Sequence, residues 1–266
     1  MRVLALDTTT RGGSAALVED HRVIAERAGD ESRTHAERLP KELTDLLEAH
    51  ACSTSDVDLF AVASGPGSFT GLRIGIATIQ GLAFVHQRPV VAVSALEALG
   101  HIGSLVAAGD ASAHRDGAQG PAGDRAPLVA AWMDAHRGEV FAALYEVGEA
   151  ALFEPGRLIE IDGASVGRPD DVLRRWSEHV AGRDVTVIGD AVPLYLDLAR
   201  SVASRTLEQP LLAAAIGRLA VARAHAGATT SPAGIQPLYV RRPDAEIARD
   251  AQRQRQAERG VETGGR

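Results

Sequence analysis

Short apolar segments at the start of the chain predict three strands. Arg2 to Asp7, Ser14 to Val18 and Val23 to Arg27 follow one another with only brief polar connections between them. Strands spaced this closely form an antiparallel meander. From Thr34 onward apolar residues recur at helical spacing, and because proline favours the first turn of a helix, we expect the regular helix to begin near Pro40.

The stretch from Asp58 to Val85 organises the rest of the chain. Its apolar run from Leu59 to Ala63 predicts a buried strand, a glycine-rich turn follows, and Gly71 to Val85 predicts a helix. At 100° per residue, the apolar and small residues of this helix cover about 220° of its circumference, which leaves Arg73, Ala77, Gln80 and Phe84 on the remainder. A surface helix needs about 100° for one core contact. We therefore expect a partner on the excess apolar surface. The predicted interface positions are Gly71, Ile74, Gly75, Thr78, Gly81 and Val85.

The remaining pattern predicts a second unit of strands and helices. A strand over Pro89 to Val93 and a helix over Ser94 to Ala108 precede Gly109 to Pro127, which lacks apolar periodicity and is typical of a long loop. Further strands are expected at Leu128 to Met133, Glu139 to Val147 and Val185 to Ile188, and further helices from Pro169, over Leu194 to Val202 and over Leu211 to Ala226.

This order of elements predicts an α/β fold of two lobes. Meander strands followed by helix-linked strands give mixed sheets with helices packed on them. We expect an N-terminal lobe over residues 1–96, completed by 211–240, and a C-terminal lobe over 97–210. Residues 241–266 carry many charges of both signs and no aromatic side chain, which is typical of a disordered, solvated tail.

The glycine-rich turn does not satisfy three familiar active-site motifs. A phosphate-binding P-loop needs a lysine at the start of the helix, and the one lysine of the chain is Lys41. A dinucleotide fingerprint needs G-x-G-x-x-G, whereas the spacing here is one residue longer, so that match is weak. A nucleophile elbow needs glycines two residues to either side of the serine, but Ser68 has Pro66 and Thr70 there. The leading interpretation is a turn that lets strand and helix pack closely.

Composition limits the class of protein further. The 266 residues include 28 basic and 35 acidic side chains, a net charge of −7, which disfavours nucleic-acid binding by bulk electrostatics. With Cys52 as the one cysteine, neither an intrachain disulfide nor a thiolate metal cluster can form. The N-terminal residues have no signal-peptide layout, and no apolar run reaches membrane-spanning length. We therefore expect a cytoplasmic protein without a membrane contact.

Five strings spread over the chain point to a known family: Asp7-Thr8-Thr9, SGPGSFTGLRIG at 64–75, VSALEAL at 93–99, RGEVF at 137–141 and PLYVR at 237–241. Together they resemble the TsaB (YeaZ-like) family, the non-catalytic partners of the tRNA threonylcarbamoyladenosine transferase TsaD. The resemblance covers residues 1 to 241. It implies two ribonuclease-H-like lobes with mixed sheets, of the actin, Hsp70 and sugar-kinase (ASKHA) type.

The resemblance also implies a place for a nucleotide. In that fold an aspartate at the end of the first strand lies beside the nucleotide phosphates and their metal, so Asp7, Thr8 and Thr9 are candidate remnants of a phosphate-binding loop. The residues alone allow another interpretation, in which Asp7 caps its own turn through its side chain. Both stay open. We expect no cofactor on the isolated chain, and ATP or ADP only in an assembled complex.

A metal site is missing where the catalytic relatives have one. Those relatives carry V-N-H-L-E-G-H after the corresponding strand, with two histidines four residues apart on one helix face. Here Ala95 and Leu99 stand at the ligand positions, and neither can bind a metal. The two histidines closest in sequence, His101 and His114, are too far apart for a local site. We predict no metal and no catalytic residue. Other histidines beside acidic groups are expected to be surface residues: His35 with Glu37, and His136 with Glu139.

The implied function is that of an adaptor. The chain would bind a TsaD-like catalytic subunit through its N-terminal lobe and support transfer of the threonylcarbamoyl group to the tRNA adenosine adjacent to the anticodon. A TsaE-like ATPase subunit would join, tRNA would be contacted only through the complex, and the chain alone would form a homodimer. The alternative is an ATP-dependent small-molecule kinase of the same fold, which needs a glycine-rich adenosine loop that Gly189-Asp190-Ala191 matches poorly. A metallopeptidase would lack its histidines.

Overall fold

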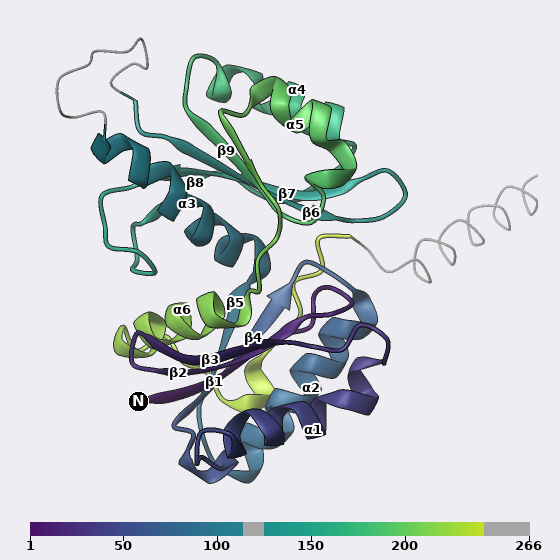
Figure 1. The fold of residues 1–266 in the computed structure, drawn as a ribbon, viewed down its shortest axis with the longest axis vertical. Coiled ribbons are helices and arrows are strands. Elements are labelled where there is room, and N and C mark those ends of the chain that lie inside the picture. The colour runs from purple at the N-terminus through teal and green to yellow at the C-terminus, as the bar shows by residue number, and fades with distance from the viewer. Residues whose placement is uncertain (114–124, 242–266) are drawn as a thin grey trace, which may run out of the picture.

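The computed structural model describes residues 1–113 and 125–241 (Figure 1). Most of the loop predicted over 109–127, and all of the predicted tail beyond Arg241, lie outside the described residues. Two five-stranded sheets lie one above the other in Figure 1 and form two lobes. Among the described residues, no helix is both long and apolar enough to cross a membrane.

The first sheet has the strand order β3-β2-β1-β4-β5. Its members are β1 (Arg2–Asp7), β2 (Ser14–Glu19), β3 (Arg22–Ala28), β4 (Leu59–Gly65) and β5 (Val90–Ser94). The first three strands pair antiparallel, as the meander pattern predicts, and β1, β4 and β5 run parallel. A meander extended by two parallel strands is the ribonuclease-H-like arrangement, so this lobe confirms the fold predicted from the sequence.

The second sheet repeats this arrangement. Its strands are β6 (Leu128–Asp134), β7 (Val140–Val147), β8 (Leu158–Gly167), β9 (Val185–Ile188) and β10 (Arg205–Leu207). Counted from β8 the order is β8-β7-β6-β9-β10, with antiparallel pairs up to β6 and parallel pairs beyond it. β6 therefore holds the same place in the second lobe that β1 holds in the first.

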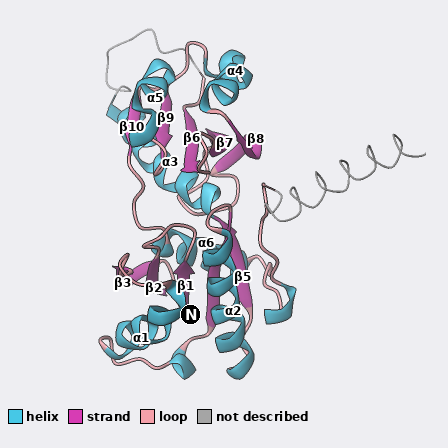
Figure 2. Cartoon of the chain, turned by 90° about the vertical axis from the view of Figure 1, so that its right-hand side faces the viewer, coloured by secondary structure: helices cyan, strands magenta, loops and turns pink. Residues whose placement is uncertain are grey.

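Helices separate and cover the two sheets. They are α1 (His35–Glu48), α2 (Phe69–Val85), α3 (Ala95–Ala113), α4 (Pro169–Val180), α5 (Leu196–Val202) and α6 (Ala213–His225). α1 and α2 cover the outer face of the first sheet, and α4 and α5 cover the outer face of the second (Figure 1). α3 and α6 lie between the sheets in both views (Figure 1 and Figure 2).

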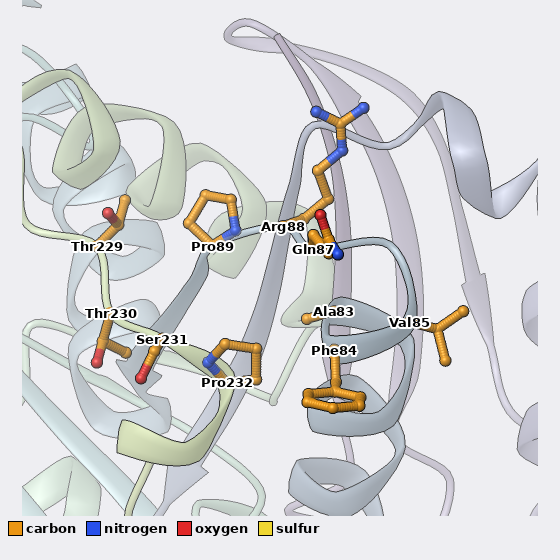
Figure 3. Close-up of a pocket in the computed structure, with 10 residues that line it drawn as sticks. All are labelled: Ala83, Phe84, Val85, Gln87, Arg88, Pro89, Thr229, Thr230, Ser231 and Pro232. Carbon is orange, nitrogen blue, oxygen red and sulfur yellow. The ribbon is translucent and has the colours of Figure 1, made fainter.

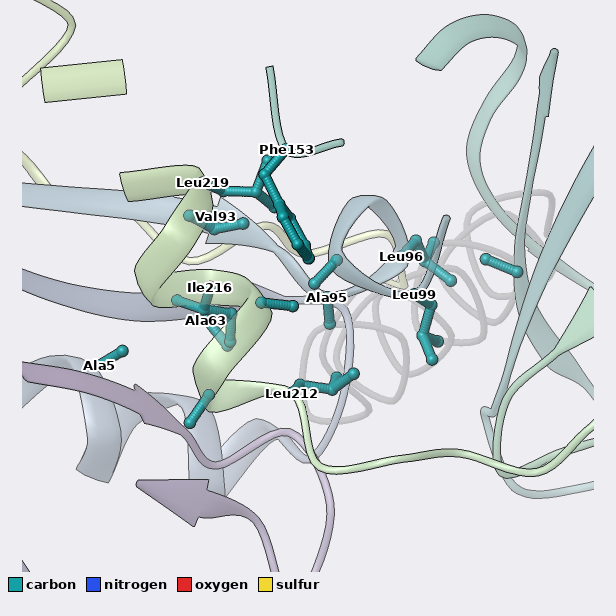
Figure 4. Packing of buried hydrophobic residues seen from close by; sticks show 14 of the residues in the cluster. Ala5, Ala63, Val93, Ala95, Leu96, Leu99, Phe153, Leu212, Ile216 and Leu219 are labelled. Carbon is teal, nitrogen blue, oxygen red and sulfur yellow. The ribbon is translucent and has the colours of Figure 1, made fainter. Parts of the chain in front are cut away.

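One buried apolar cluster runs through the space between the lobes. It joins Val3 of the first sheet to Val129 of the second through α3 and α6, and Figure 4 shows Leu99 of α3 and Ile216 of α6 within it. Separate clusters lie under the outer helices of each sheet. Because the central cluster is shared, the two lobes pack on each other through these two helices.

Four elements differ most from the sequence predictions. α1 begins at His35 and holds Pro40 inside it, because the Thr34–Glu37 capping box fixes the start and buried Leu39 and Leu43 hold the helix on the sheet. α3 continues past the predicted loop boundary to Ala113. β8 and the three-residue β10 were not predicted. β8 is an edge strand with irregular pairing and half-exposed side chains, so its apolar alternation is weak.

Candidate functional site

The turn after β1 holds the predicted phosphate-loop residues in a closed arrangement. Oδ1 of Asp7 accepts hydrogen bonds from the backbone N–H of Thr9 at 2.9 Å and from the Thr9 hydroxyl at 2.7 Å. Asp7, Thr8 and Thr9 are all buried, with exposed fractions of 2%, 0% and 3%. Asp7 therefore caps its own turn, as the second interpretation of the sequence proposed.

Burial also changes the acidity of this site. Desolvation raises the pKa of Asp7, and the carboxylate of Asp190 in the second lobe raises it further, against the lowering effect of the Thr9 hydrogen bonds. Asp190 is half-buried, and desolvation raises its pKa as well. Its Oδ1 accepts the backbone N–H of Asp134 at 2.8 Å. Desolvation thus disfavours the charged form of both carboxyl groups, one from each lobe.

Asp134 is a site residue that the sequence reasoning missed. It ends β6 in the second lobe as Asp7 ends β1 in the first. Its side chain accepts the backbone N–H of His136 at 2.8 Å, and the exposed His136 ring approaches it at 2.9 Å. The available signal was an aspartate directly after an apolar strand pattern, a position like that of Asp7, which the family resemblance had selected.

These residues do not fit a phosphate group as they stand. The Thr8 and Thr9 side chains are covered by protein, and an added phosphate would place negative charge beside Asp7 and Asp190, whose burial already opposes ionisation. Among residues 1–113 and 125–241, no three His, Cys, Asp or Glu side chains are grouped to hold a metal. Nucleotide binding in an assembled complex stays a prediction.

A buried histidine supports the loop that follows this turn, contrary to the expectation that His35 is a surface residue. His35 is 8% exposed and its Nε2 lies 3.0 Å from the carbonyl oxygen of Thr10. Its Nδ1 lies 2.6 Å from Nη2 of Arg38, which can only donate, so Nδ1 accepts and the ring is neutral. Burial and the Arg38 charge lower the pKa of His35. The prediction failed because α1 begins at His35, earlier than expected.

The partner-interface residues predicted on α2 fall into two groups. Gly71 and Gly75 are buried on the turn after β1, where a Cβ would lie 2.2 Å from the Thr8 carbonyl oxygen and 2.1 Å from Thr8 Oγ1, respectively. Their small size therefore serves a contact inside the chain, and they are not on the surface. A Cβ at Gly81 would meet nothing within 4 Å.

The other positions reach the surface of α2. Ile74 and Thr78 are half-buried, and the Thr78 hydroxyl bonds back to the Ile74 carbonyl at 2.8 Å. Val85 is 73% exposed. Phe84, which the helical arc had assigned to the opposite side, is 77% exposed. The last turn of α2 thus presents two adjacent large apolar side chains to solvent, which makes it a candidate contact surface for a partner.

A surface cavity of about 670 Å³ adjoins these side chains. It lies between the end of α2 and the segment Thr229–Pro232, which pairs with Val90 at the edge of the sheet (Figure 3). Phe84 and Val85 both line it, and the Val85 side chain points away from that segment. The C-terminal end of α2 therefore combines two exposed apolar side chains with an adjoining surface cavity.

The residues at the metal-ligand positions of the catalytic relatives are part of the core. Ala95 and Leu99 are both 0% exposed and belong to the apolar cluster between the lobes (Figure 4). Even a ligating side chain at either position would lie among apolar groups.

The two repeated lobes, with α3 and α6 between them, define an ASKHA-type α/β protein. The family model "TsaD: tRNA N6-adenosine threonylcarbamoyltransferase" matches residues 28–249. The chain is 33% identical over 187 residues to the tRNA threonylcarbamoyladenosine biosynthesis protein TsaB of Escherichia coli K12, covering 70% of this chain and 71% of the relative. YeaZ from Pseudomonas aeruginosa has a TM-score of 0.68 at 30% identity, over 90% of this chain and 99% of that one. The chain belongs to the TsaB (YeaZ-like) family.

Proposed function

We propose that this chain acts in tRNA threonylcarbamoyladenosine biosynthesis as a non-catalytic adaptor of a TsaD-type catalytic subunit. The observation that carries the proposal is the burial of Ala95 and Leu99 in the core, at the positions where the catalytic relatives hold their metal. The chain keeps the fold and the sequence frame of that enzyme while its metal site is filled with apolar side chains. Its contribution is then shape and surface.

The surface we assign to the partner is the exposed side of α2. Val85 and Phe84 expose large apolar groups at the end of the helix, and Gly81 leaves open space above it. Ile74 and Thr78 lie half-buried along the same helix. Burying such side chains against a second protein removes apolar surface from water, which favours association. The isolated chain would use the same face to pair with a second copy.

The remaining partners follow from this role. A TsaE-type ATPase subunit would join the pair, tRNA would be contacted through the assembled complex, and ATP or ADP would be bound only there. The relatives are named for tRNA threonylcarbamoyladenosine biosynthesis, which supports a place for this chain in that pathway. The turn at Asp7 gives no support to the kinase alternative, because the Asp7 carboxylate already accepts two hydrogen bonds from Thr9.

Sedimentation velocity with a purified TsaD-type subunit from the same organism tests the proposal. We expect a one-to-one complex that Val85→Glu weakens at least tenfold, because a charge desolvated in an apolar interface is costly. The matched control is Leu194→Glu, which places the same charge on an apolar side chain of the second lobe that is 59% exposed. Equal affinity of both variants, or no complex with the wild-type chain, contradicts the proposal.

A further inference from the structure

The segment after α6 crosses from the first lobe to the second. We call residues 235–241 the C-terminal strap (yellow in Figure 1). It starts at Ile235, which is 3% exposed and packed in the core under α1 and α2. The backbone N–H of Leu238 then donates to the carbonyl oxygen of Ser64, at the end of β4, at 2.7 Å. The strap is thus fixed to the first lobe at the turn that leads into α2.

Tyr239 fixes the strap to the first turn of α2 itself. Its hydroxyl accepts a hydrogen bond from Nε of Arg73 at 3.0 Å, and its ring centre lies 5.2 Å from that of Phe69. The Arg73 guanidinium lies 3.9 Å from the Phe69 ring centre, a cation–π contact. Phe69 and Tyr239 are 38% and 39% exposed. These two aromatic side chains, one from α2 and one from the strap, are therefore accessible at the surface beside the start of the helix.

Arg241 fixes the other end of the strap to the second lobe. Its Nη1 donates to the carbonyl oxygen of Ala135 at 2.6 Å, and its Nη2 pairs with the Glu139 carboxylate. Its guanidinium lies 5.8 Å from the centre of the Phe141 ring. One side chain therefore ties together both arms of the β6–β7 turn. That turn directly follows Asp134, whose backbone N–H donates a hydrogen bond to the Asp190 carboxylate.

We propose that the C-terminal strap couples the partner surface of α2 to the β6–β7 turn of the second lobe. The partner surface of α2 includes Ile74, which follows Arg73 in the helix, so a partner bound there also restrains the Arg73–Tyr239 contact. Tyr239 and Arg241 are two residues apart in the strap. Loss of the Arg241 contacts leaves Tyr239 less fixed on α2, and loss of the Tyr239 contacts leaves the turn less fixed. The proposal rests on the proposed function for the identity of the partner, but the coupling itself belongs to this chain.

The coupling also gives a physical role to two of the sequence strings. RGEVF at 137–141 supplies Glu139 and Phe141, and PLYVR at 237–241 supplies Tyr239 and Arg241. The strings lie about a hundred residues apart and form one contact between the lobes. Neither string includes Asp7, Thr8 or Thr9, so this contact between the lobes is separate from the buried turn after β1.

Hydrogen exchange on the isolated full-length chain tests the coupling without any partner. Arg241→Ala should raise amide exchange about tenfold in residues 134–141, where its contacts are lost, and also in residues 69–76, which Arg241 does not touch. Arg241→Lys keeps the charge but loses the planar fork and should show the same two effects more weakly. The control Arg174→Ala removes a surface ion pair to Asp171 on α4 and should change neither segment.

Affinity for the catalytic subunit supplies the second readout. Arg241→Ala and Tyr239→Ala should each weaken binding about fivefold or more, within the usual range of coupling between sites, and the double variant should lose no more than Tyr239→Ala alone. Exchange that rises only in 134–141 overturns the proposal, as does additive loss of affinity in the double variant. If the exchange effects are coupled but no TsaD-type subunit binds, the coupling stands and the proposed function fails.

Discussion

Two glycines of α2 should respond in opposite ways to the same substitution. A Cβ at Gly75 would lie 2.1 Å from Thr8 Oγ1 and 3.0 Å from Thr8 Cγ2, well inside the van der Waals contact distance of about 3.5 Å. Thr8 is fully buried, so a rotation of its side chain would meet other packed atoms. At Gly81 the same atom would meet nothing within 4 Å. Gly75→Ala should therefore destabilise the chain and Gly81→Ala should stabilise it.

The difference in unfolding free energy between the two variants follows from one effect that they share and one effect that acts only at Gly75. Replacing a helical glycine by alanine stabilises by about 0.5–1 kcal/mol, and this gain applies equally to both positions. Overpacking a buried contact costs about 1–3 kcal/mol, and this cost applies only at Gly75. The unfolding free energies of the two variants should thus differ by about 1–3 kcal/mol.

Urea unfolding followed by circular dichroism measures this difference. Since self-association would make stability depend on concentration, each variant is measured at two protein concentrations tenfold apart. If Gly75→Ala is as stable as Gly81→Ala, the close approach of α2 to the turn after β1 is wrong. The assignment of Gly75 to a contact inside the chain then fails with it.

Four further outcomes are expected. Gly81→Glu and Ile74→Glu should each leave a folded chain by circular dichroism that no longer self-associates in sedimentation velocity; unchanged association would remove that edge of α2 from the interface. Burial lowers the pKa of His101 to about 4. Stability should therefore be full above pH about 6.5 and fall, by at most about 1.4 kcal/mol per pH unit, down to about 4; an equal slope in His101→Asn would refute this. Truncation after Arg242 should leave melting temperature and partner affinity unchanged, because the strap is retained. Elemental analysis after dialysis against a weak chelator should find no stoichiometric zinc or iron.

The fold was predictable because its signals are local. Apolar runs such as Arg2 to Asp7 and the helical spacing after Gly71 identify elements without knowledge of their neighbours. The edge strand β8 was missed because its side chains are half-exposed on both faces and Gly163 interrupts the pattern. Pro40 misled the start of α1 because the capping box and the buried leucines outweigh the cost of one lost helical hydrogen bond.

The site was less predictable because it depends on contacts between distant parts of the chain. The sequence identifies Asp7 and Asp134 as equivalent strand ends only once the second sheet is seen to repeat the first. Glycine spacing on α2 predicted close packing, but it could not tell a contact with Thr8 from a contact with a partner. The arc calculation placed Phe84 outside the apolar arc, where it is 77% exposed, but it did not identify this large apolar side chain as part of a partner surface.

Reconstitution of tRNA modification tests the adaptor role most directly. Threonylcarbamoyladenosine is quantified by mass spectrometry after incubation of unmodified tRNA with the threonylcarbamoyl adenylate and three protein mixtures: this chain, a TsaD-type subunit with its TsaE-type ATPase, or all three together. We expect no product from this chain alone, little from the pair without it, and a large increase when it is added. Product formed by this chain alone, or equal product with and without it, would contradict an adaptor.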